Sequence, residues 1–170
     1  MTSLLSCLSA ILLPLAPVAA GDMSSVARPP VAATRSVFLG KWELDLTRMP
    51  DTYGPPPKRV LFEFREIGDG KWRTIVDVYD RDGTVRHMPM AYRPDGRPVP
   101  AEVPNGEADA VAVLSPVPDT LVVNLGRAKT LGSVRVYTVL PGGNEMIESA
   151  AGLNGDGEPF VRTFHFKRLR

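Results

Sequence analysis

The feature that most constrains this fold is a series of short segments between residues 37 and 170 in which apolar and polar residues alternate. Alternation with a period of two places successive side chains on opposite faces of a β-strand, whereas a helix would need a period of 3.6. Turn signals such as Gly68-Asp69-Gly70 and Arg81-Asp82-Gly83 separate the segments, and Asp-Gly supplies the positive φ of a tight hairpin turn. The pattern predicts an all-β domain without helices.

About nine strands are expected, at residues 38–47, 59–67, 71–80, 84–93, 109–114, 121–125, 134–140, 145–151 and 160–167. A turn at Pro94-Asp95-Gly96 and a Pro-rich loop over residues 97–105 are expected between the fourth and fifth, and Pro89 within the fourth indicates an edge strand or a bulge. Consecutive hairpins form a meander, and a meander of eight or more twisted strands tends to close, because closure removes its edges. We predict an up-and-down antiparallel barrel of about eight to nine strands, with a Greek-key sandwich as the alternative.

The first twenty residues predict export. They carry no charged side chain, have an apolar core around residues 10–15 and end in Val18-Ala19-Ala20 before Gly21, which is the pattern of a signal peptide and too short for a membrane-spanning helix. We expect residues 1–20 to be removed, residues 21–36 to be a flexible Ala/Ser/Pro-rich leader, and residues 37–170 to form the domain. The expected location is the periplasm or the medium; an uncleaved apolar anchor is the alternative.

The cysteine content and the charge exclude several classes of function. The single cysteine, Cys7, lies in the predicted signal peptide, so the mature chain would have no internal disulfide, thiolate zinc site or cysteine nucleophile. Lysine and arginine number 20 against 19 acidic residues, a net charge of +1, with the two signs interleaved along the chain. Without a basic stripe, we expect neither nucleic-acid binding nor insertion into a membrane after signal cleavage.

Two short motifs at opposite ends of the domain carry a family resemblance. Gly40-Lys41-Trp42 begins the first predicted strand, and Lys167 and Arg168 end the last one. This spacing resembles the lipocalin and calycin pattern. The resemblance implies that Trp42 plugs the closed end of a barrel and that a basic side chain, Arg168 or otherwise Arg162 or Lys167, covers its ring. A guanidinium on an indole face contributes about 0.5–2 kcal/mol. Gly40, Trp42 and Arg168 are therefore expected to be structural.

A second resemblance covers nearly the whole mature chain. Gly-Lys-Trp-Glu-Leu, the Gly-Asp-Gly and Arg-Asp-Gly turns, and the run Tyr92-Arg93-Pro94-Asp95-Gly96-Arg97-Pro98-Val99 are similar to small exported lipocalin-like barrel proteins of proteobacteria. The resemblance implies the fold and supplies no catalytic residues.

One face of the second to fourth predicted strands is rich in aromatic residues and methionine. Its members are Phe62, Phe64, Trp72, Met88, Met90 and Tyr92. Inside a barrel they would form a contiguous apolar surface, which is either an ordinary packed core or a pocket for one small ligand. The pocket interpretation predicts a protein that binds a small hydrophobic or aromatic molecule; the sequence leaves the ligand's identity and the oligomeric state open.

The catalytic alternative depends on three residues of the fourth strand, Arg86, His87 and Tyr92. No phosphate-binding loop, nucleophile elbow or metal-ligand motif is present in the sequence, so we expect no metal and no cofactor. A small-barrel lyase, isomerase or cyclase could still use these side chains in acid/base chemistry. Alternation places Arg86 and Tyr92 on one face and His87 on the other. An envelope interaction protein is a third possibility.

Two further polar residues, Asn124 and Glu148, fall in otherwise apolar predicted strands and are candidates for the interior. A lone buried carboxylate is costly. A buried Glu148 would therefore need Arg135 or Arg162 beside it.

Overall fold

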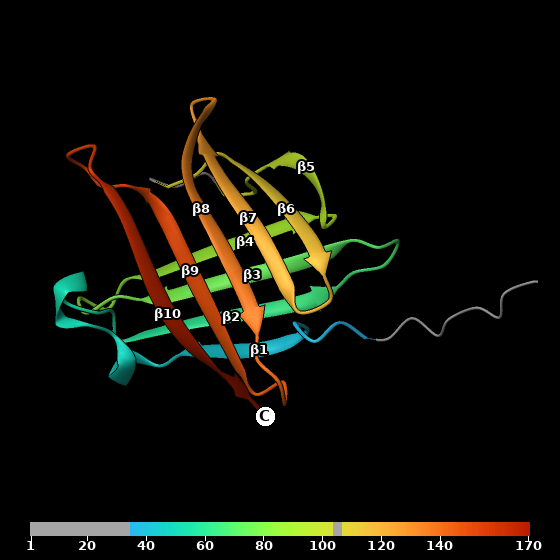
Figure 1. The fold of residues 1–170 in the computed structure, drawn as a ribbon, viewed down its shortest axis with the longest axis horizontal. Coiled ribbons are helices and arrows are strands. Elements are labelled where there is room, and N and C mark those ends of the chain that lie inside the picture. The colour runs from blue at the N-terminus through green and yellow to red at the C-terminus, as the bar shows by residue number, and fades with distance from the viewer. Residues whose placement is uncertain (1–34, 104–106) are drawn as a thin grey trace, which may run out of the picture. The chain divides into compact units, whose positions relative to one another are not determined.

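The structure is a computed structural model that describes residues 35–103 and 107–170 (Figure 1). The predicted signal peptide and most of the predicted leader lie outside the described residues. Ten strands are present: β1 (Gly40–Leu44), β2 (Arg59–Glu66), β3 (Trp72–Tyr79), β4 (Val85–Tyr92), β5 (Asp95–Pro100), β6 (Ala110–Val117), β7 (Thr120–Arg127), β8 (Thr130–Val139), β9 (Glu145–Leu153) and β10 (Pro159–Leu169). In the described part of the chain no helix is long and apolar enough to cross a membrane.

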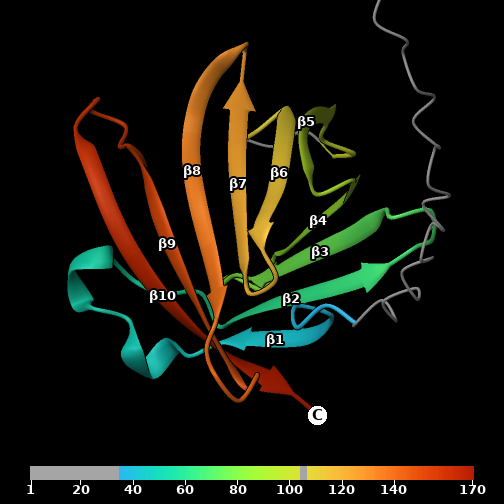
Figure 2. The ribbon, with the colours of Figure 1, turned by 45° about the vertical axis from the view of Figure 1, so that its right-hand side comes forward.

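All ten strands belong to one antiparallel sheet in the order β4-β3-β2-β1-β10-β9-β8-β7-β6-β5. The first strand joins the two halves, because β1 pairs with β2 on one side and with the last strand, β10, on the other. Figure 2 shows β1–β4 on one side of the barrel and β6–β10 curving over the other. The sheet stays open between β4 and β5, which are its two edges. The predicted up-and-down barrel is confirmed, with ten strands rather than eight or nine.

The additional strand is β5, in the segment where the sequence predicts a turn and a loop. Pro98 and Pro100 lack the N–H that a central strand must donate. The strand forms nonetheless because it is an edge: it pairs only with β6, and its register shifts between Asp95 and Pro98. The proline in β4 has the same explanation, since β4 is the opposite edge and its register with β3 is unbroken. The edge alternative for Pro89 is therefore right, and the bulge is absent.

The first strand is shorter than predicted, and the expectation of no helix is corrected at this point. After Leu44 the chain forms two single-turn 3-10 helices, η1 (Leu46–Arg48) and η2 (Asp51–Tyr53). Asp45 starts the first turn by accepting hydrogen bonds from the N–H and the hydroxyl of Thr47, at 3.2 and 2.6 Å, a local side-chain bond that competes with the strand ladder. The second turn lies against β10, where the Tyr53 hydroxyl accepts from the N–H of Thr163 at 3.0 Å.

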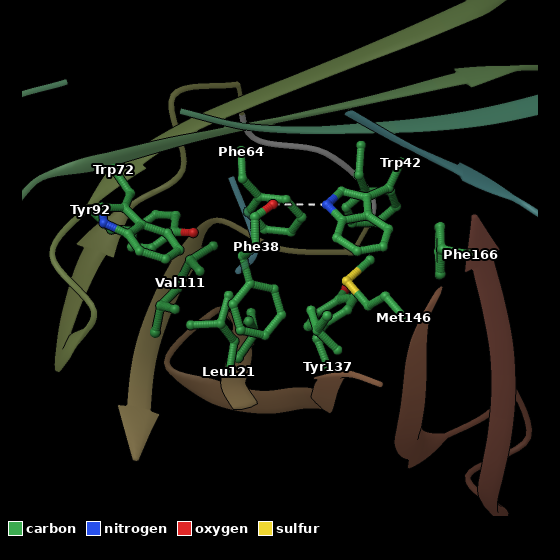
Figure 3. Close-up of a cluster of buried hydrophobic side chains, with 14 of the residues drawn as sticks. Phe38, Trp42, Phe64, Trp72, Tyr92, Val111, Leu121, Tyr137, Met146 and Phe166 are labelled. Carbon is green, nitrogen blue, oxygen red and sulfur yellow. Dashed lines mark hydrogen bonds between the residues drawn. The ribbon is translucent and has the colours of Figure 1, made fainter. Parts of the chain in front are cut away.

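Trp42 plugs one end of the barrel and is completely buried (Figure 3). Its indole N–H donates to the carbonyl of Phe38 at 2.8 Å, and the guanidinium carbon of Arg168 lies 4.0 Å from the centre of its ring. Arg168 also donates to the carbonyls of Gly143 at 2.6 Å, Leu39 at 2.7 Å, and Val37. Of the three basic candidates, Arg168 is the one over the tryptophan.

Glycine is required at position 40 for two reasons. Its φ is 122°, a conformation that L side chains rarely adopt, and a Cβ there would lie 3.0 Å from Nη1 of Arg168. The backbone at Gly40 thereby lets the guanidinium reach the Trp42 ring.

Candidate functional site

The interior of the barrel contains a cavity of about 270 Å³. Its lining comes mainly from the inward faces of β2, β3, β4 and β6–β10 and is predominantly apolar. Protein interiors are normally packed as densely as organic crystals, with few voids larger than a water molecule. The cavity is close to the lower end of the range for ligand pockets, about 300–1,000 Å³. The barrel's own side chains therefore leave room for one small molecule.

Five of the six predicted lining residues border this cavity: Phe62, Phe64, Met88, Met90 and Tyr92. The prediction for Trp72 is corrected, because this residue is buried in the core without bordering the cavity. Trp72 is the first residue of β3, and its ring centre lies 6.5 Å from that of Phe38 (Figure 3). Trp72 is thus on the same face of the strands as the five lining residues but lies outside the part of the interior that contains the cavity.

The three residues of the catalytic alternative do not converge on the cavity. Arg86 borders it, but its half-exposed guanidinium forms two hydrogen bonds with Asp80, at 2.8 and 3.1 Å. His87 lies outside, with Nδ1 2.6 Å from a carboxylate oxygen of Asp77, so the alternation places it correctly on the other face.

Tyr92 is the only one of the three in the buried interior, and its chemistry is that of a neutral phenol. Its hydroxyl is hydrogen-bonded to that of Thr74 at 2.7 Å. Burial raises the pKa of Tyr92 to about 12, although the bond with Thr74 acts in the opposite direction. The phenol therefore stays protonated at neutral pH.

A buried polar cluster borders the cavity from β8 and β9. Glu148, on β9, is 2 % exposed and accepts a hydrogen bond from Nη1 of Arg135, on β8, at 2.6 Å. Nη2 of Arg135 donates to a third cavity residue, Glu107. The requirement that a buried Glu148 have an arginine beside it is met by Arg135. The companion expectation for Asn124 is wrong: its side chain is exposed, on the outer face of β7.

Burial dominates the titration of this cluster. It raises the pKa of Glu148, while the charge and hydrogen bonds of Arg135 and a hydrogen bond with Tyr137 act the other way. Burial, together with the Glu148 charge, raises the pKa of the Tyr137 phenol well above 10. Tyr137 also borders the cavity, and it was not among the predicted lining residues. The alternation of side chains along a strand could have predicted it: Tyr137 follows Arg135 by two residues, so both side chains lie on the inner face of β8.

The described ranges, 35–103 and 107–170, contain no group of three His, Cys, Asp or Glu side chains that could hold a metal ion. The polar chemistry that borders the cavity is that of one arginine with two carboxylates, the hydroxyls of Thr74, Tyr92 and Tyr137, and the half-exposed Arg86.

Comparisons with known proteins establish the fold. No protein-family model matches the sequence, and no curated protein matches it. Among solved structures, a single-residue mutant of the fluorescent protein UnaG is similar, with a TM-score of 0.55, 12% identity and coverage of 79% of this chain and 97% of that one. Fatty-acid-binding protein 1 of Echinococcus granulosus is also similar, with a TM-score of 0.51, 11% identity and coverage of 79% and 98%. The chain therefore shares the fold of these two proteins, which in this chain is a nearly closed antiparallel barrel of ten strands.

Proposed function

We propose that this protein is an exported binding protein that holds a small hydrophobic molecule inside its barrel. The observation that carries the proposal is the cavity of about 270 Å³ with its mainly apolar lining. Protein interiors rarely leave apolar space of this size between their side chains, and a ligand that occupies the cavity would explain it.

The lining favours a flat or flexible apolar ligand. Phe62 and Phe64 offer aromatic surface from β2, and Met88 and Met90 offer polarisable, adaptable side chains from β4. The cavity volume limits the ligand to a small molecule. The likeness to a barrel whose name states that it binds fatty acids supports a hydrophobic ligand.

The binding test compares two substitutions that are adjacent in sequence. Val123 borders the cavity, whereas the side chain of Val122 lies on the outer face of β7. We expect N-phenyl-1-naphthylamine, an uncharged dye that fluoresces in apolar surroundings, to bind the unchanged protein with a one-to-one stoichiometry. Val123→Phe should fill the space and weaken dye binding at least about tenfold, or about 1.4 kcal/mol, while Val122→Phe should leave it unchanged.

Circular dichroism would show that both variants are folded. Equal dye binding by the two, or no dye binding by the unchanged protein, would contradict the proposal. Native mass spectrometry of protein purified from its own host would identify a retained ligand directly.

Export is proposed from residues 1–20, with their uncharged apolar run and small residues before Gly21. N-terminal sequencing of the protein from its host tests this part separately. A mature chain that begins shortly after Ala20 supports export with cleavage, and one that begins at Met1 contradicts it.

A further inference from the structure

Among the described residues, each cation that borders the cavity is already paired with a carboxylate. The two arginines in the described lining are Arg86 and Arg135. Arg86 is held by Asp80 through two hydrogen bonds. Arg135 donates to two carboxylates at once, Glu148 through Nη1 and Glu107 through Nη2.

The net charge of the Arg135 cluster is zero or negative in either protonation state of Glu148. Arg135 is positive, and Glu107, whose side chain is nearly half exposed, is negative. Glu148 adds a second negative charge when it is ionised and nothing when it is protonated. An anionic group that entered the cavity would lose its hydration and gain no compensating charge, which is strongly unfavourable in an apolar interior.

Building on the proposed function, we infer that the cavity selects uncharged apolar ligands and rejects carboxylates and sulfonates of similar size. A ketone, an ester or an alcohol with an apolar body meets this requirement. Selection arises because Glu107 and Glu148 have already neutralised the arginine.

Matched probes that differ in one charged group test the inference on the full folded protein. Dodecan-1-ol and dodecanoate have the same chain and differ at the head group, and each would compete with N-phenyl-1-naphthylamine in a fluorescence titration. We expect the alcohol to displace the dye at a concentration at least about tenfold lower than dodecanoate, or about 1.4 kcal/mol. 1-Anilinonaphthalene-8-sulfonate, which is the dye with a sulfonate added, should bind correspondingly weakly.

A charge-removal variant tests the cause. The Glu107→Gln/Glu148→Gln double variant keeps the shape of the site and frees the charge of Arg135, so dodecanoate should gain at least about tenfold relative to the alcohol. Glu145→Gln is the control. Glu145 lies on β9, as Glu148 does, but its carboxylate is exposed and 3.6 Å from Arg48, so this variant should not change the ratio of the two affinities. If the double variant does not fold, the single Glu107→Gln substitution at the more exposed position should shift the ratio in the same direction.

The outcomes separate the two proposals. Equal affinity for alcohol and acid, or a ratio that the charge-removing variants do not change, would overturn the inference and leave ligand binding intact. Failure of the neutral dye and the alcohol to bind at all would overturn the proposed function, and the inference with it.

Discussion

The guanidinium of Arg168 closes the plugged end of the barrel, and its removal should be among the most destabilising single changes at the surface. The side chain stacks on Trp42 at 4.0 Å and donates to the carbonyls of Val37, Leu39 and Gly143. It thereby ties the chain before β1 and the β8–β9 turn to the last strand.

The magnitude follows from these contacts. The stacking contributes about 0.5–2 kcal/mol. Each hydrogen bond from a charged group contributes about 1.5–3 kcal/mol when it is fully formed and shielded. The three bonds share one guanidinium, and the carbonyls at this end can regain water, so the contributions are not additive. We expect Arg168→Ala to lower the free energy of unfolding by about 3–4 kcal/mol, and Arg168→Lys by about half of that, because lysine retains the charge without the planar fork.

Urea denaturation followed by circular dichroism and by the fluorescence of the two tryptophans would measure the change, with Arg170→Ala as the control at an exposed neighbouring arginine. The slope with urea should be unchanged, since the surface exposed on unfolding is the same. A loss below about 1 kcal/mol for Arg168→Ala, or an equal loss for Arg170→Ala, would refute the interpretation of Arg168 as a clamp.

Two titrations give further predictions. Because the pKa of Tyr92 is raised from 10.0 to about 12 in the fold, its contribution to stability is complete below pH 10 and is lost as the pH rises towards 12, by about 3 kcal/mol in all. Tyr92→Phe should reduce this alkaline decline without abolishing it, since the pKa of Tyr137 is raised as well; an unchanged decline in urea titrations at pH 9–12 would contradict this. The pKa of Asp45 is lowered from 3.8 to about 2 by its hydrogen bonds with Lys167 and Thr47, so the stability it provides is present above pH 4 and is lost as the pH falls towards 2. Asp45→Asn should flatten the stability profile in that interval, and the same slope in both proteins would show that another group is responsible.

The strands could be predicted from the sequence wherever local pattern and tertiary role agree. In β2 and β3 the alternation of apolar and polar residues is regular, and their observed bounds lie within the predicted ones. The prediction of strands failed where the hydrogen-bonding pattern of the sheet accepts residues that strands usually avoid. The prolines of β5 are acceptable only at the edge of a sheet, and the tertiary topology decides which strands are edges. The turn between β7 and β8 was not predicted either. Its residues Ala128 and Lys129 adopt positive φ angles of 51° and 63°, which are usually provided by glycine or asparagine.

The candidate site divides in the same way. Apolar lining residues such as Phe62 and Met90 could be predicted, because the inward face of a strand repeats every second residue. Trp72 could not be excluded, since its depth depends on how Phe38 packs beside it. The pair of Arg135 with Glu148 joins neighbouring strands and was one of the predicted alternatives. The pair of Arg135 with Glu107, 28 residues away in sequence, depends on the tertiary arrangement of the chain around β6 and β8.

The amino-acid sequence by itself determined the all-β class, the up-and-down order of the strands and the Gly40-Lys41-Trp42 motif, because these depend on side-chain periodicity and turn chemistry, which are local. The tertiary structure decided where the sheet stays open, which basic residue covers Trp42, and that the interior retains a cavity bordered by a neutralised arginine. Those properties depend on the register between distant strands and on how completely side chains from opposite walls fill the space between them, and no local pattern encodes either.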